Sequence, residues 1–244
     1  MLATIMAILI FEAESTKEVE ESGDFIEPCA DPKYCVKNSL QASLPAFVRG
    51  VPELGIDSLD PFFIKNLTLL LPGDLRVQYT QGISKGAKKC VVDIARITGD
   101  ILDFQIRCNL TIKGKYRSTG QLFMFAIDGE GNSMIRCRNI KIQCVIKLGT
   151  TVGQDGKKYL EIRNFKYHHS YDGQVFYHMD NLIKGNPQLG AIIMEFMNNN
   201  WRLVAEEFGT PIVDLGVTSA LKNIKKFLKA VPMNQIASTS VFNI

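Results

Sequence analysis

The sequence predicts an α+β protein in which a strongly curled antiparallel β-sheet covers the apolar side of C-terminal helices. Residues 102–113 alternate apolar and polar side chains through six repeats, as expected of a long strand with one solvent-exposed face. After Asn186 the apolar spacing becomes helical, and that helical surface carries more apolar residues than a solvent-facing helix needs. Only the curled sheet is available to cover it.

The first residues have the character of a signal peptide. An uninterrupted apolar run extends from Leu2 to Phe11, which is too short to span a bilayer as a helix. A buried N-terminal helix is the alternative. We expect 1–16 to be the signal peptide, 17–237 to form a single domain and 238–244 to be a C-terminal tail. The protein is then secreted and extracellular.

Two triplets agree with export. Asn66 and Asn109 each begin an Asn-Leu-Thr sequon, which accepts N-linked sugar in the secretory pathway. The chain also has an even number of cysteines, six. Cys29 and Cys35 flank a short loop that Pro32 would help to turn, so they are either a disulfide or two free surface thiols.

The other four cysteines, Cys90, Cys108, Cys137 and Cys144, lie in strand-like surroundings, and the sequence leaves their pairing open. Cys108 and Cys144 share the apolar face of their strands, where a buried thiol acts as a small hydrophobic group.

Eight strands are expected along the middle of the chain. Three Asp-Gly pairs, at 128–129, 155–156 and 172–173, favour the positive φ of hairpin turns. Together with the alternation they predict a consecutive antiparallel meander, long enough to curl. Its strands are 64–70, 75–81, 90–98, 101–113, 119–127, 133–148, 158–168 and 174–180.

The helical region is expected to begin with Pro187 in the first turn and to run to residue 208, a helix of about 22 residues. Gly209 and Pro211 interrupt it, and a second helical stretch at 212–228 ends before Pro232. The polar side of this second stretch carries Lys222, Lys225, Lys226 and Lys229. The stripe is interpreted as a solvated face; weak docking on an anionic membrane surface is the alternative.

Composition and motifs argue against several functions. With 28 Lys and Arg against 25 Asp and Glu, the charge of +3 is too even to indicate a nucleic-acid partner. Ser84 lies in GISKG, residues 82–86, and matches the G-x-S-x-G nucleophile motif, but residues 87–98 read as a strand where that motif needs a helix. Ser84 is therefore interpreted as a hairpin-turn residue.

Metal and cofactor sites are not expected. His168 and His169 are adjacent on a predicted strand and so point to opposite faces, which prevents both from binding one metal. No phosphate-binding loop is present, so we expect no cofactor.

In order along the chain come a leader, a close cysteine pair, an extended segment at 44–64, a meander and terminal helices. This order resembles the insect juvenile hormone-binding and takeout-like family of secreted proteins, from Cys29 to about Ile236. Ile183, where the family usually has Phe, and the tail STSVFNI depart from its pattern. The matching residues are Cys29, Cys35, Pro45, Gly50, Pro52, Leu59, Asp60, Pro61, Asn181, Leu182, Gly185, Asn186, Leu189, Gly190, Asn198, Trp201 and Pro211.

The resemblance implies a long C-terminal helix wrapped by a highly curved antiparallel sheet that encloses an elongated hydrophobic tunnel for a lipophilic ligand. It also implies that Cys29 and Cys35 form a structural disulfide, and it places the chain in a family with circadian and feeding-related members. Hormone-binding members have a second bridge later in the chain.

We therefore expect a secreted, monomeric carrier of a hydrophobic small molecule such as a terpenoid hormone, a fatty acid, a pheromone or another lipid, without catalysis. An esterase of lipophilic esters that uses Ser84 is the alternative. The tunnel wall residues are chosen by strand parity or helix face. They are Phe104, Ile106, Phe123, Phe125, Ile140, Ile142, Phe165, Ile192, Phe196 and Phe208.

Overall fold

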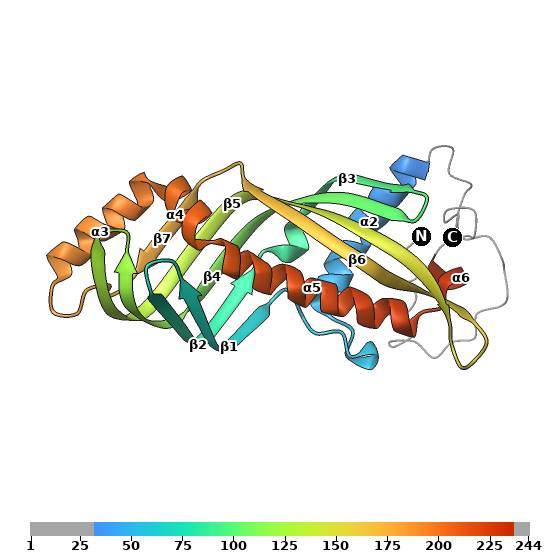
Figure 1. Cartoon of the computed structure of the whole chain (residues 1–244), viewed down its shortest axis with the longest axis horizontal. Helices are drawn as coiled ribbons and strands as arrows, with labels where there is room; N and C mark the ends of the chain where they lie inside the picture. The colour runs from blue at the N-terminus through green and yellow to red at the C-terminus, as the bar shows by residue number, and fades with distance from the viewer. Residues whose placement is uncertain (1–31, 237–244) are drawn as a thin grey trace.

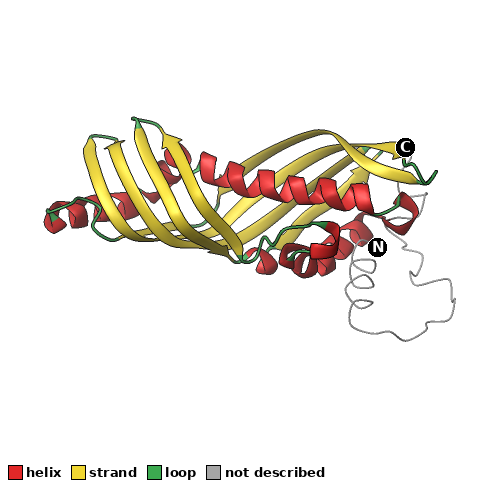
Figure 2. Cartoon of the chain, turned by 90° about the horizontal axis from the view of Figure 1, so that it is seen from below, coloured by secondary structure: helices red, strands yellow, loops and turns green. Residues whose placement is uncertain are grey.

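The structure is a computed structural model that describes residues 32–236, with side chains from Val36 onward. A curled sheet forms its body, and α5 runs along it (Figures 1 and 2). Seven strands make up the sheet: β1 (Phe62–Leu71), β2 (Leu75–Lys85), β3 (Val91–Thr98), β4 (Ile101–Leu122), β5 (Phe125–Val152), β6 (Lys158–Tyr171) and β7 (Val175–Met179). The helices are α2 (Pro32–Arg49), α3 (Pro187–Asn199), α4 (Trp201–Phe208), α5 (Thr210–Ala230) and α6 (Met233–Ile236), with short 3-10 turns η1 (Pro52–Leu54) and η2 (Ala87–Lys89).

Two very long strands organise the sheet. The main path of paired strands is β1-β2-β4-β5-β6, all antiparallel. β3 pairs only with β4 and β7 only with β5, so β1, β3, β6 and β7 each have a single strand partner. One edge of β4 is shared by β3, along 101–107, and β2, along 111–119. The far edge of β5 is shared by β7, along 133–137, and β6, along 140–152. The sheet is therefore antiparallel as predicted. It is not closed, and it is not a simple consecutive meander.

The predicted turn at Asp128-Gly129 is wrong. Both residues lie inside β5 and pair with Thr119 and Ser118 of β4. The chain turns instead at Phe123 and Met124, where Phe123 takes a positive φ of 54°. The predicted strand 101–113 therefore continues to Leu122 as β4, and the predicted strand 119–127 is divided between β4 and β5. The sheet has seven strands instead of the predicted eight. The other two Asp-Gly pairs do lie in the β5–β6 and β6–β7 connections.

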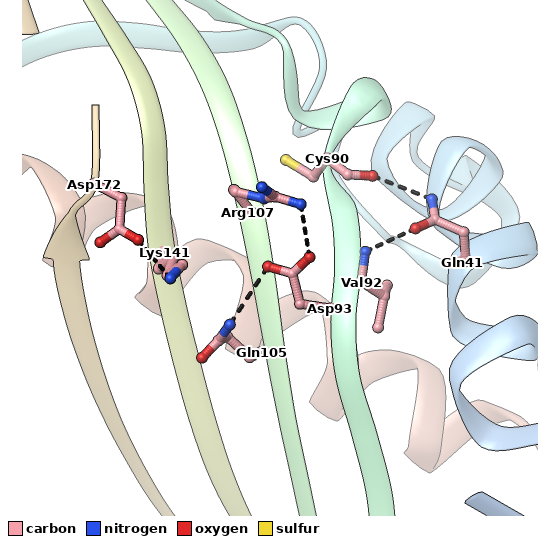
Figure 3. Close-up of polar contacts among 8 residues, drawn as sticks. All are labelled: Gln41, Cys90, Val92, Asp93, Gln105, Arg107, Lys141 and Asp172. Carbon is pink, nitrogen blue, oxygen red and sulfur yellow. Dashed lines mark hydrogen bonds and ion pairs between the residues drawn. The ribbon is translucent and has the colours of Figure 1, made fainter. Parts of the chain in front are cut away.

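The segment 44–64 is not extended throughout, because α2 continues through Pro45 to Arg49. The helix stops at Gly50, which adopts a φ of 91°. Gln41 fixes α2 to the sheet: its Nε2 donates to the carbonyl of Cys90 at 3.1 Å, and its Oε1 accepts from the N–H of Val92 at 2.7 Å (Figure 3). These two bonds satisfy the carbonyl of Cys90 and the N–H of Val92, on the edge of β3 that has no strand partner.

Ion pairs on the outer face of the sheet tie neighbouring strands together. Asp93 of β3 pairs with Arg107 of β4 at 2.9 Å, and Lys141 of β5 pairs with Asp172 after β6 (Figure 3). All four side chains are at least one-fifth exposed, so each pair contributes about 1 kcal/mol or less.

The predicted 22-residue helix is divided into α3 and α4 at Asn200. Asn residues favour local side-chain to backbone bonds over helix continuation, and here the Asn200 Nδ2 donates to the carbonyl of Phe196 at 2.9 Å. The long helix of the fold is instead α5, of 21 residues. It begins after Gly209 and ends before Pro232, as the breaker residues predict.

Two apolar clusters form the core, and α5 contributes to both. Val217 belongs to the cluster with β2, β4, β5 and α4, whereas Phe227 and Leu228 pack with Ile146, Leu148 and Leu160. Within residues 32–236, none of the helices combines the length and the apolar character that crossing a membrane requires.

Candidate ligand-binding site

An apolar cavity of about 440 Å³ lies between the sheet and helices α2, α4 and α5. All six apolar positions of the alternating run in β4 line it, as do the five in the second half of β5. The predicted strand faces are thus confirmed. They are Leu102, Phe104, Ile106, Cys108, Leu110 and Ile112 in β4, and Ile140, Ile142, Cys144, Ile146 and Leu148 in β5.

The inward face of β5 changes parity at Asn139. Before that residue the lining positions are odd (Ile127, Ile135 and Cys137), and after it they are even. The cause is a register irregularity in which Cys108 pairs with Ile140 and Leu110 pairs with Cys137. Asn139 takes a φ of 48° there, which Asn tolerates better than most residues. The irregularity keeps apolar side chains on the inner face along all of β5.

Six of the ten predicted wall residues line the cavity. These are Phe104, Ile106, Ile140, Ile142, Phe165 and Phe208. The strand-parity choices within β4, β5 and β6 account for five of them, and the helix face of α4 accounts for the sixth.

Three other predicted wall residues form an aromatic cluster at the end of the sheet. Phe123 packs edge-on against Phe196 and Phe208, with ring centroids 5.9 and 5.1 Å apart. Phe125 packs against Phe196 at 5.3 Å. The cluster fixes the β4–β5 hairpin to α3 and α4. Phe123, Phe125 and Phe196 do not line the cavity.

The helix-face assignment of Ile192 is wrong. Its side chain is 58% exposed, whereas Ile193 and Met197 are buried on α3. Figures 1 and 2 show α3 at the far end of the molecule, where little of the sheet remains to cover its second face.

The cavity wall carries hydroxyl groups but no formal charge. Among the described residues, none that lines it is Asp, Glu, Lys, Arg or His. Tyr79 accepts a hydrogen bond from the hydroxyl of Ser133 at 3.2 Å, and burial raises the pKa of Tyr79, Tyr171 and Tyr177. These phenols therefore stay neutral, and the cavity presents an uncharged, apolar surface.

A disulfide joins Cys90 to Cys108 inside the cavity wall. The expected strands 90–98 and 101–113 contain the signal for it, because a tight turn at 99–100 places position 90 within one residue of position 108. A one-residue bulge at Asp93 completes the match. Cys137 and Cys144 are free thiols, and burial raises the pKa of each to about 12. Cys29 and the side chain of Cys35 lie outside the described residues.

Ser84, the residue considered for hydrolysis, has no histidine partner within the described chain. Ser84 lies inside strand β2, paired with Phe62 and Ile112, and is not a hairpin-turn residue. It lines the cavity, but none of the hydrogen bonds found for residues 36–236 joins it to a histidine. His169 lies instead against Tyr167 and Tyr171, and His178 pairs with Asp180. Over the described residues, no three His, Cys, Asp or Glu side chains gather where a metal could bind.

Both sequon asparagines are exposed on the outer side of the sheet. Asn66 adopts a φ of 47° in β1, and Asn109 lies at the β4 irregularity, where its Oδ1 accepts from the N–H of Asn139 at 2.8 Å. Attachment of sugar at the Nδ2 of Asn109 is compatible with that bond.

Comparison with known proteins gives consistent matches. The family model for haemolymph juvenile hormone binding protein matches residues 4–238. The crystal structure of Takeout 1 from Epiphyas postvittana superposes with a TM-score of 0.80 at 27% identity, covering 85% of this chain and 96% of that one. Circadian clock-controlled protein daywake from Drosophila yakuba and from Drosophila melanogaster is 22% identical over 184 residues, which is 70% of each chain.

Proposed function

Because the chain belongs to the haemolymph juvenile hormone binding protein family, we propose that it is a secreted carrier that binds one hydrophobic small molecule in its apolar cavity. The molecule is a terpenoid hormone, a fatty acid, a pheromone or another lipid. Binding removes apolar surface from water, which contributes roughly 25 cal/mol per Å² before the costs of association.

The observation that carries this proposal is the uncharged and mostly apolar lining of a space about 440 Å³ in volume. Well-packed cores contain few voids larger than a water molecule, so a space this large is not a packing defect. Lining residues extend along β4 from Leu102 to Leu122, a contour of roughly 65 Å at the usual rise per residue. We therefore propose an elongated tunnel that suits a chain-like ligand.

Native mass spectrometry with lipid extraction tests the proposal on protein purified from its own source. A single class of copurifying lipid, released on denaturation, is the expected result. Protein that carries no lipid, and that also fails to bind added lipids, would contradict it.

A cavity-filling variant locates the binding site. Ile106 lines the cavity, so Ile106→Trp should reduce lipid binding by filling the space. Val145 is 38% exposed on β5 and does not line the cavity, so Val145→Trp is the matched control. Equal affinity of both variants for the extracted lipid would place the ligand elsewhere.

An esterase remains the second candidate, because Ser84 lines the same cavity. Ser84→Ala separates the two functions: a carrier keeps its affinity and shows no turnover of a lipophilic ester before or after the change. Ester hydrolysis that Ser84→Ala abolishes would favour the enzyme.

The proposed route of export includes cleavage of the signal peptide 1–16, sugar on Asn66 and Asn109, and a monomeric 17–237 domain. N-terminal sequencing, a mass shift on treatment with a glycosidase, and light scattering test these three features in turn. Weak, salt-sensitive contact with anionic membranes would use Lys222, Lys225 and Lys229, since Lys226 is paired with Asp57. If the protein does not sediment with anionic vesicles at low salt, this membrane contact is contradicted.

A further inference from the structure

The cavity contains one buried hydroxyl without a partner. Ser118 is 2% exposed, and its Oγ is the one buried side-chain nitrogen or oxygen of the described residues that has no hydrogen bond. Most buried polar side-chain atoms have a partner, and leaving one unpaired destabilises the fold. The hydroxyl of Ser118 therefore requires an explanation beyond folding.

Ser118 faces the cavity at the end remote from α2. It pairs with Val77 of β2 and Gly129 of β5, on the half of β4 that lies beyond the β3 pairing (Figure 1). Gly129 lets the segment at Leu182 pack against β5 here, because a Cβ at that position would collide with the carbonyl oxygen of Leu182. Ser118 and Leu182 both line this part of the cavity.

The surroundings of Ser118 do not supply its missing partner. Val77, which pairs with Ser118, is apolar, as are the lining residues Leu122, Ile127 and Leu182. The hydroxyl of Tyr79, two residues from Val77, is already bonded to Ser133. A buried water typically makes about three hydrogen bonds, so a single hydroxyl among apolar side chains is a poor water site. A ligand atom is the remaining partner that would satisfy it.

We propose that Ser118 is the polar contact of the ligand: its hydroxyl donates a hydrogen bond to an uncharged oxygen at one end of an elongated apolar molecule. The oxygen belongs to an alcohol, an ester, a ketone or an ether. An ionised carboxylate fits less well, because burying a charge without a counter-charge is costly and no charged described residue lines the cavity. This inference rests on the proposed carrier function and narrows its ligand class.

The test compares four probes of one chain length: dodecane, dodecanol, methyl dodecanoate and dodecanoate. Each displaces a fluorescent apolar dye from the full protein, delivered from the same solvent. Ser118→Ala removes the hydroxyl without adding bulk, and it should fold at least as stably as the original because it removes an unpaired polar group.

Ser219→Ala is the matched control. Ser219 lies on α5 and does not line the cavity, and its hydroxyl already donates to the carbonyl of Leu215 at 2.8 Å. Ser118→Ala should weaken dodecanol and methyl dodecanoate by about threefold to tenfold and leave dodecane unchanged. Ser219→Ala should leave all the affinities unchanged.

Four outcomes would overturn the inference, and the last of them also bears on the proposed function. Equal weakening of dodecane and dodecanol, or no weakening of dodecanol, would show that Ser118 makes no polar contact. Tighter binding of dodecanoate than of methyl dodecanoate by the original protein would overturn the uncharged ligand class. Failure of the original protein to bind any of the four would contradict the carrier function itself, and the inference would fall with it.

Discussion

Asn223 in α5 binds both backbone groups of Asp57, accepting from its N–H at 3.1 Å and donating to its carbonyl at 2.7 Å. The Asn223 side chain is 1% exposed. It joins two parts of the chain that are 166 residues apart and fixes α5 against the turn that follows α2. The relationship suggests that one amide holds the long helix in place over the cavity.

We expect Asn223→Ala to lower the free energy of unfolding by about 1–3 kcal/mol, because it leaves the Asp57 backbone groups unpaired. Chemical denaturation measures the change. Lys225→Ala, at an exposed position on the same helix, should stay within about 0.5 kcal/mol. If both variants are equally stable, Asn223 does not fasten α5.

Breaking the disulfide should also destabilise the protein. Cys90 and Cys108 are 18 residues apart, and closing a loop of that size contributes about 3 kcal/mol. We expect the double variant Cys90→Ala and Cys108→Ala to lose about that amount. Cys137→Ala, which removes a free thiol, should lose less.

The pairing itself can be checked by alkylation of the unreduced, denatured protein. Cys137 and Cys144 should be labelled, whereas Cys90 and Cys108 should stay protected until reduction. Labelling of Cys90 before reduction would show that this pair does not form.

His169 should make stability depend on pH. Its burial first, and then the charge of nearby His168, lower its pKa below the ordinary 6.5, although Asp214 opposes the shift. The rings of Tyr167 and Tyr171 lie 6.1 and 5.5 Å from the His169 ring, centroid to centroid. Tyr167 also donates a hydrogen bond to Asp214. Because the unfolded chain takes up the proton first, the contribution of His169 is complete above about pH 6.5 and is lost as the pH falls toward its folded-state pKa.

We therefore expect wild type to lose more stability than His169→Gln between pH 7.5 and pH 5, starting near the ordinary pKa of about 6.5. Urea midpoints over that range measure the difference. Parallel curves for the two proteins would show that His169 does not titrate differently on folding.

The aromatic cluster should matter for stability and not for ligand affinity. Phe196 contacts Phe123 and Phe125 but does not line the cavity. Phe196→Ala should cost about 2–3 kcal/mol, somewhat less than for a fully buried ring. Ile192→Ala, one turn away and 58% exposed, should be close to neutral.

Binding of dodecanol separates these roles. Phe196→Ala should retain the original affinity, whereas Phe104→Ala, which alters the cavity wall, should change it. A larger affinity loss for Phe196→Ala than for Phe104→Ala would instead indicate that Phe196 contacts the ligand.

Local patterns predict much of the cavity wall. In β4 the alternation from Leu102 to Ile112 identifies which side chains point inward, because successive side chains on a strand point to opposite sides. The breakers Gly209 and Pro232 likewise place the ends of α5 to within two residues. No long-range information is needed for either result.

Other features depend on which segments meet. The turn at Phe123–Met124 carries no Asp-Gly signal and is fixed by the packing of Phe123 against Phe196 and Phe208. Ile192 and Phe196 are four residues apart on α3, yet only Phe196 finds aromatic partners on the hairpin. The exposure of Ile192 and Phe196 depends on which element packs against α3, and the helical spacing of apolar residues does not identify that element.

The sequence by itself determined the apolar face of β4 from Leu102 to Ile112 and the ends of α5, because both follow from patterns only a few residues long. The tertiary structure alone decided the bulge at Asp93 that brings Cys90 opposite Cys108, the change of face of β5 at Asn139, and the missing partner of Ser118. Each of these depends on strand register, and register is set by the summed packing of segments that are distant along the chain.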